Sequence, residues 1–110
     1  MVFEGKVLNP SIVSPTTLND IRNALNKVVS PEGTGKLAMS DKIAIAGKTG
    51  AFVNTSGILG AKAASFCGYF PAIKPQFACL IKIYNPQNGS YYGSTVAAPL
   101  FKQIAEGIIP

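Results

Sequence analysis

The sequence contains no histidine and no tryptophan, and Arg22 is its one arginine. Without histidine, the chain lacks the usual general base of serine and cysteine hydrolases and the imidazole ligands of common zinc sites. Two cysteines, Cys67 and Cys79, are too few for a disulfide framework, and their sequence positions leave both free thiols and a cross-strand bridge open. We therefore expect no metal and no cofactor, and acid–base chemistry would fall to lysine, tyrosine or a carboxylate.

Negative charge is also scarce, because five Asp and Glu residues face ten Lys and Arg residues and give a formal net charge of +5. The lysines are spread from Lys6 to Lys102 without clustering. A nucleic-acid interface needs a basic face or stripe together with aromatic or arginine side chains. The charge pattern therefore predicts a solvated surface and no nucleic-acid partner.

Long apolar runs are missing as well. No segment approaches the roughly 20 consecutive apolar residues that cross a bilayer, and residues 1–10 lack the pattern of a signal peptide. With 110 residues, 47% of them hydrophobic and 14% charged, the chain is expected to form one globular domain at most, and it does not have the composition of a disordered segment. We expect any membrane anchor to lie outside this chain.

Two segments carry apolar residues at helical spacing. The first is predicted to start at Pro15 with Ser14 as its N-cap and to end before Pro31. The second begins at about Thr95 and continues to Ile108, with its proline confined to the first turns. Both segments are predicted to be amphipathic helices, each with one apolar face for a core.

Three segments between these helices have the patterns of strands. Residues 42–49 alternate long and small side chains and predict a strand that ends at the threonine, and residues 54–60 predict a loop. Residues 63–70 and 77–84 predict a hairpin with residues 71–76 as its loop, and this connection is too short for a crossover helix. The element order predicts an α+β fold, an antiparallel sheet with the helices packed on one face.

Two glycine-containing motifs superficially resemble phosphate-binding loops. Gly47-Lys48-Thr49 fails as the end of a P-loop, because Lys42 stands where the first glycine belongs and residues 50–57 have no helical pattern. Gly33-Thr34-Gly35 is a lone Gly-x-Gly and is better interpreted as an ordinary loop. The sequence therefore does not predict a nucleotide site.

Lys48-Thr49-Gly50 also matches the Lys-Thr-Gly element shared by penicillin-binding proteins and serine β-lactamases. Its surroundings follow the order found near the C-terminus of class B penicillin-binding proteins, and the matching groups are Gly33-Thr34-Gly35, residues 46–50, residues 65–72, Pro75, Pro86, Tyr92-Gly93 and residues 97–101. From about residue 7 to residue 109 the chain resembles this family. The resemblance implies that residues 1–110 are a C-terminal fragment of a peptidoglycan transpeptidase domain.

The resemblance implies a role for each residue of this element. Lys48 would supply charge to the substrate carboxylate and a proton path to the leaving group, and Thr49 would align the stem peptide along the sheet edge. Gly50 would let the acyl group lie against the backbone, and the N–H of Ala51 would be the second donor of the oxyanion hole. Lys48 and Ala51 are thus the expected catalytic residues, and all four residues are expected to bind substrate.

The sequence departs from the family pattern in two ways. The family usually has Thr or Ser after Lys-Thr-Gly, so Ala51 removes a hydroxyl, and we expect carboxylate binding to be weaker by roughly 1 to 2 kcal/mol. The Ser-x-x-Lys nucleophile motif and the Ser-x-Asn element are both absent. By this mechanism the chain alone cannot form an acyl-enzyme, and we expect it to be a piece of a longer enzyme.

The resemblance therefore implies part of a D,D-transpeptidase that cross-links cell-wall stem peptides. The alternatives are a non-catalytic binding or scaffold module of the same fold and a fragment of a serine β-lactamase. The implied partners are the D-Ala-D-Ala stem peptide, β-lactams and the rest of the domain, whose absence would leave an apolar surface and promote self-association. The parent protein is expected to be anchored in the inner membrane, with this domain in the periplasm or cell exterior.

Overall fold

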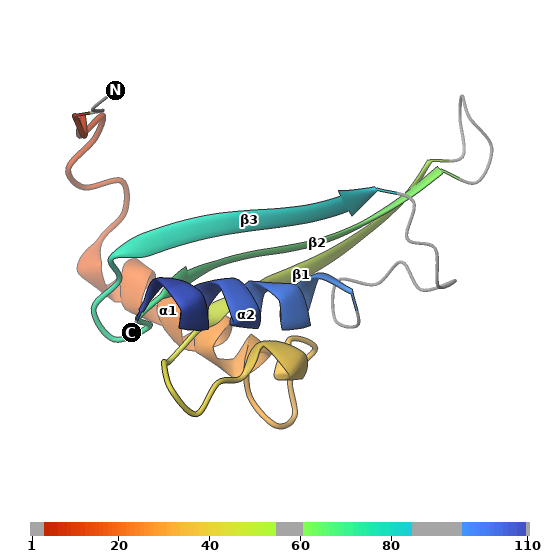
Figure 1. The fold of residues 1–110 in the computed structure, drawn as a ribbon. Coiled ribbons are helices and arrows are strands. Elements are labelled where there is room, and N and C mark those ends of the chain that lie inside the picture. The colour runs from red at the N-terminus through yellow and green to blue at the C-terminus, as the bar shows by residue number, and fades with distance from the viewer. Residues whose placement is uncertain (1–3, 55–60, 85–95, 110) are drawn as a thin grey trace.

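The computed structural model describes residues 4–54, 61–84 and 96–109, with side chains described outside 52–54 and 61–62 (Figure 1). The expected order of helix, three strands and helix is confirmed. The elements are α1 (Pro15–Val28), the short 3-10 helix η1 (Lys36–Ala38), β1 (Ala46–Asn54), β2 (Ala61–Phe70), β3 (Phe77–Tyr84) and α2 (Ala97–Ile108). Of the loop predicted at 54–60, Asn54 instead ends β1, and residues 55–60 lie outside the described residues, as do Pro86 and Tyr92-Gly93.

Helix α1 begins where the sequence predicts. The Ser14 hydroxyl accepts a hydrogen bond from the Thr17 backbone N–H at 3.2 Å, and Pro15 occupies the first helical turn. This cap satisfies one of the N–H groups that have no partner within the helix. The helix ends at Val28, whose carbonyl accepts a hydrogen bond from the Gly35 N–H at 2.8 Å. The chain after α1 therefore folds back over the helix end.

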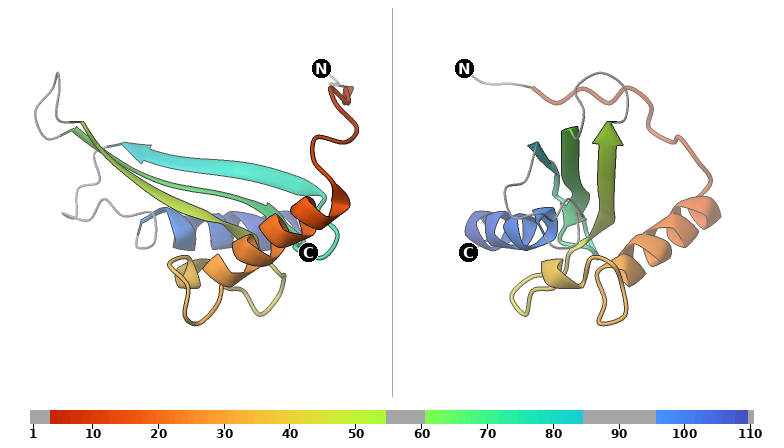
Figure 2. Two further views of the ribbon diagram at one scale, coloured as in Figure 1. Left: turned by 180° about the vertical axis from the view of Figure 1, so that it is seen from behind. Right: turned by 90° about the vertical axis from the view of Figure 1, so that its right-hand side faces the viewer.

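The three strands form one antiparallel sheet in the order β1-β2-β3. Both helices lie below the sheet in Figure 1. Figure 2 shows one helix toward each edge of the sheet, with α2 in contact with β2 and β3 and α1 in contact with β1. The predicted α+β fold with helices on one face is confirmed. Because β2 is the only neighbour of β1 within the described sheet, β1 has one free edge.

The register separates the side chains of the sheet into two sets. One row contains Thr49, Phe66 and Ile81, and its phenylalanine packs against α2, so we call this side the helix face. The next row contains Lys48, Cys67 and Leu80, all exposed, and we call this side the open face. Cys79 pairs with Gly68, one row away from Cys67, so the two thiols lie on opposite faces and both are free.

The first strand differs from its prediction at both ends. Residues 42–45 do not pair as a strand, and β1 starts at Ala46 and continues to Asn54. Ile43 and Ile45 are both buried in the core, so the alternation that suggested a strand reflects burial of a connecting segment. β1 extends past the threonine because it keeps pairing with β2 as far as Asn54 and Ala61.

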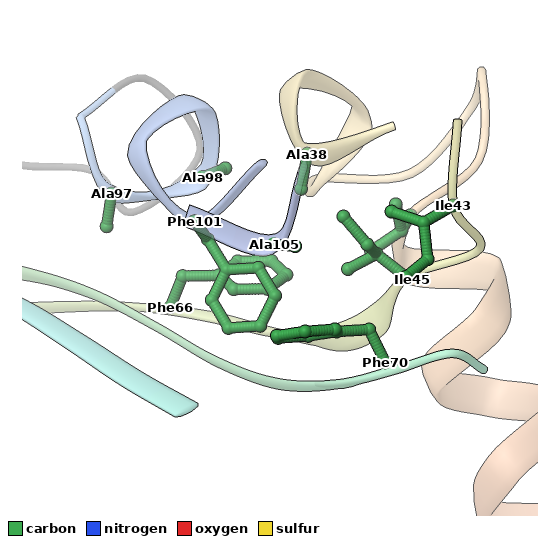
Figure 3. Close-up of a cluster of buried hydrophobic side chains, with 10 residues drawn as sticks. Ala38, Ile43, Ile45, Phe66, Phe70, Ala97, Ala98, Phe101 and Ala105 are labelled. Carbon is green, nitrogen blue, oxygen red and sulfur yellow. The ribbon is translucent and has the colours of Figure 1, made fainter. Parts of the chain in front are cut away.

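The core lies between the sheet and α2 (Figure 3). Its largest fully buried side chains are Phe66 and Phe70 from β2 and Phe101 from α2. The rings of Phe66 and Phe101 are 4.7 Å apart, and Phe70 meets Phe101 edge-on at 5.7 Å. The other buried residues of α2 are all alanines, which lets the helix lie close to the sheet. This packing fixes β2 and, through its register, the position of β1.

Candidate functional site

The Lys-Thr-Gly element lies within β1, at the third to fifth of its nine residues. The expectation that it ends the strand is therefore wrong, and the element lies inside an edge strand of the described sheet. Lys48 and Ala51 are exposed, and Thr49 and Gly50 are half-buried. Because β1 is paired on one side, about half of its backbone N–H and C=O groups point away from β2. The four predicted site residues are thus contiguous and accessible.

The Lys48 side chain lies along the strand toward Thr49, the next residue. Its Nζ donates to the Thr49 carbonyl oxygen at 3.0 Å and lies 3.5 Å from Thr49 Oγ1. An ammonium group and a hydroxyl are therefore adjacent at the edge of the sheet. Together they offer donors to a carboxylate or to another anionic group, which accepts hydrogen bonds and attracts positive charge.

A third polar side chain joins this pair from a distant part of the sequence. Thr34 Oγ1 and Thr49 Oγ1 are 3.2 Å apart, although the residues are separated by 15 positions. From the sequence, Gly33-Thr34-Gly35 is expected to be an ordinary loop, and Thr34 is not among the predicted site residues. The two flanking glycines, and the place of this group in the resemblance to the family, are the signals that point to a constrained segment.

The glycines of this loop explain how Thr34 reaches the strand. A Cβ on Gly33 would collide with the Val28 carbonyl at the end of α1, and a Cβ on Gly35 would lie 3.2 Å from the Phe66 ring. The backbone N–H of Gly35 also donates to the Val28 carbonyl at 2.8 Å. The loop is therefore packed tightly between the helix end and the core, with Thr34 facing β1.

The neighbouring strand leaves no room for a side chain at Gly50. It pairs with Ser65 on β2, and a Cβ at position 50 would lie 2.5 Å from Ser65 Oγ. A side chain there would displace the serine or lift the strand. Because Gly50 has no side chain, nothing projects from the open face of β1 at this position beside Lys48, and a ligand has room against the backbone.

The described residues contain no group of three or more Cys, Asp or Glu side chains that could hold a metal ion. A cavity of about 230 Å³ lies near the end of α1, lined by residues such as Asn26, Met39 and Ser40, and it does not include the Lys-Thr-Gly element. Among the described helices, none is long and apolar enough to cross a membrane.

Comparison with known proteins identifies the family. The model of the penicillin binding protein transpeptidase domain matches residues 3–106. The chain belongs to this family. It is 33% identical to the probable peptidoglycan D,D-transpeptidase PenA of Neisseria gonorrhoeae over 96% of its length, and 32% identical to the peptidoglycan D,D-transpeptidase FtsI of Buchnera aphidicola over 97%.

Solved transpeptidase domains have the same fold. The transpeptidase domain of FtsI4 from Legionella pneumophila superposes with a TM-score of 0.78 at 34% identity over 90% of this chain. That of penicillin-binding protein 3 from Burkholderia pseudomallei gives 0.79 at 30% identity over 91%. The chain spans 19% of the length of the two curated relatives and 37% and 31% of the two solved chains, so it is part of a transpeptidase domain.

Proposed function

We propose that this chain supplies the substrate-binding edge strand of a peptidoglycan D,D-transpeptidase, a penicillin-binding enzyme that cross-links cell-wall stem peptides through an acyl-enzyme. The observation that carries this proposal is the adjacent ammonium of Lys48 and hydroxyl of Thr49 on an edge strand, in a chain that belongs to the transpeptidase family. The nucleophilic serine and its lysine come from a segment outside this chain, because no Ser-x-x-Lys occurs here.

Lys48, Thr49 and Ala51 each have a distinct part in the proposed reaction. A stem peptide ending in D-alanine, or a β-lactam in its place, lies along the free edge of β1, where backbone groups pair with it. Lys48 attracts the terminal carboxylate and passes a proton toward the leaving amine, and Thr49 donates its hydroxyl to the carboxylate. The N–H of Ala51 stabilises the oxyanion that forms when the serine attacks the carbonyl.

The exposed apolar surface supports a longer parent protein. Leu80 and Tyr84 on the open face are 61% and 68% exposed, and α1 has no buried residue although Leu18 and Ile21 form an apolar side. Large contiguous apolar patches are rare on monomeric proteins, so we expect the rest of the domain to cover these surfaces and the isolated chain to self-associate. A parent that acts on peptidoglycan would work in the periplasm or at the cell exterior, anchored in the inner membrane.

Labelling with a fluorescent penicillin tests the proposal. The complete protein that carries this chain is incubated with the reagent, and the covalent adduct is measured after denaturation. We expect labelling of the unsubstituted protein and a fall of at least 100-fold in the acylation rate for Lys48→Ala, the order found when a group that stabilises transition-state charge is lost. Lys74→Ala is the matched control, because Lys74 is an exposed lysine of the loop between β2 and β3.

The same experiment distinguishes the alternatives. Absence of any adduct at saturating reagent would contradict the transpeptidase proposal and indicate a non-catalytic module of the same fold. Rapid loss of the adduct with turnover of a chromogenic β-lactam would indicate a serine β-lactamase. An equal effect of Lys48→Ala and Lys74→Ala on labelling would remove Lys48 from the reaction.

A further inference from the structure

The contact between Thr34 and Thr49 differs from the other side-chain hydrogen bonds of the described residues. Each of the others joins groups within three positions of one another, whereas this one joins a loop to a strand across 15 positions. The Thr49 hydroxyl in this contact also lies 3.5 Å from Lys48 Nζ. The loop therefore contacts the proposed carboxylate site directly.

The backbone holds Thr34 in this place independently of its hydroxyl. Gly33 packs on the end of α1, and its carbonyl accepts a hydrogen bond from the Lys36 N–H at 3.2 Å. Gly35 is buried beside the Phe66 ring and donates to the Val28 carbonyl. Because both neighbours are fixed by main-chain contacts, the Thr34 side chain is presented to β1 at little further cost in conformational entropy.

The numbers of protons and lone pairs on the threonine hydroxyls, the Lys48 ammonium and the substrate carboxylate determine which group donates in each hydrogen bond. A threonine hydroxyl has one proton and two lone pairs, the Lys48 ammonium can only donate, and an ionised carboxylate can only accept. When Thr49 donates its one proton to a carboxylate, it cannot also donate to Thr34. The contact between the two threonines must then run from the Thr34 hydroxyl to Thr49 Oγ1.

We propose that Thr34 is a positioning residue, whose hydroxyl donates to Thr49 Oγ1 and so turns the Thr49 proton toward the terminal carboxylate of the substrate. This proposal rests on the proposed function of the Lys-Thr-Gly strand. Ala51 supports the positioning role of Thr34, because the chain has no hydroxyl at position 51 and carboxylate recognition depends more on Thr49. The residue acts through Thr49 and does not touch the reacting carbonyl.

The test compares a fluorescent penicillin with the methyl ester of its carboxylate, using the complete protein. Thr34→Val removes the donor at nearly the same volume, Thr34→Ser keeps the donor, and Thr16→Val is the control, since Thr16 is an exposed threonine of the first turn of α1. For each variant, the second-order acylation rate is measured with both reagents. The ratio of the two rates does not depend on how much of the protein is folded.

We expect Thr34→Val to lower the rate with the free carboxylate by about three- to tenfold, the effect of one hydrogen bond, and to leave the rate with the ester unchanged. Thr34→Ser restores the ratio, and Thr16→Val does not alter it. An equal loss with both reagents, or no loss with either, would overturn the positioning role while the labelled unsubstituted protein still supports the proposed function. If the unsubstituted protein is not labelled at all, the proposed function fails and this role fails with it.

Discussion

Gly47 lies against the Phe66 ring: a Cβ at position 47 would come within 2.7 Å of a ring carbon and within 2.5 Å of the Cys67 carbonyl oxygen. The residue directly before Lys48 is therefore in contact with the core and with the backbone of β2. This contact links the position of the proposed site to the packing of Phe66 against Phe101, whose rings are 4.7 Å apart.

Substitution of Gly47 by alanine is predicted to destabilise the domain by about 1–3 kcal/mol, because the new methyl group overpacks a site bounded by backbone and a fully buried ring. Gly107→Ala is the matched control, since a Cβ there meets nothing within 4 Å and alanine favours the helix by up to about 1 kcal/mol. Chemical unfolding of the complete domain should show effects of opposite sign. A neutral Gly47→Ala would contradict the close packing of β1.

Truncation of Phe101 to alanine is predicted to cost about 3–5 kcal/mol, because this ring is fully buried between α2 and β2. Leu100→Ala, on the same helix and 39% exposed, should cost much less. Thermal unfolding of the two variants measures the difference. Similar losses for both would mean that α2 presents a different face to the sheet.

Replacement of Ser14 by alanine removes the cap of α1 and is predicted to lower stability by about 1 kcal/mol. Ser14→Asp keeps an oxygen acceptor for the Thr17 N–H and should retain most of the stability. Urea unfolding of both variants provides the measurement. The loss is expected to leave penicillin labelling of the folded protein unchanged, since Ser14 does not contact the Lys-Thr-Gly element.

Introduction of a hydroxyl next to the proposed site is predicted to strengthen carboxylate binding. Ala51→Thr adds a donor at an exposed position of β1, and one hydrogen bond to a charged group corresponds to about 1–2 kcal/mol, or roughly five- to thirtyfold in affinity. Saturation kinetics of penicillin acylation separate binding from the chemical step. Ala51→Val, which adds bulk without a donor, should not produce the gain. If the valine variant gains equally, the hydroxyl is not the cause.

The sequence by itself determined the elements and the family. Helical spacing after Ser14, the two strand-like runs of the hairpin and the short connection between them are local patterns, and the expected helix and antiparallel strands are found. The Lys-Thr-Gly element with its surroundings likewise indicates the transpeptidase family from the sequence alone. These features could be predicted because they depend on residues that are close in the chain.

The tertiary structure decided what depends on distant contacts. It placed Lys48 inside β1 instead of at its end, because β1 keeps pairing with β2 as far as Asn54. It excluded residues 42–45 from the strand as well, because their alternating pattern reflects burial of Ile43 and Ile45 in the core without strand pairing. It also brought Thr34 to Thr49, since that contact follows from the packing of a glycine loop between a helix end and the Phe66 ring. Neither the end of β1 nor the contact of Thr34 has a periodic signal in the sequence, because each arises from the way separate elements pack together.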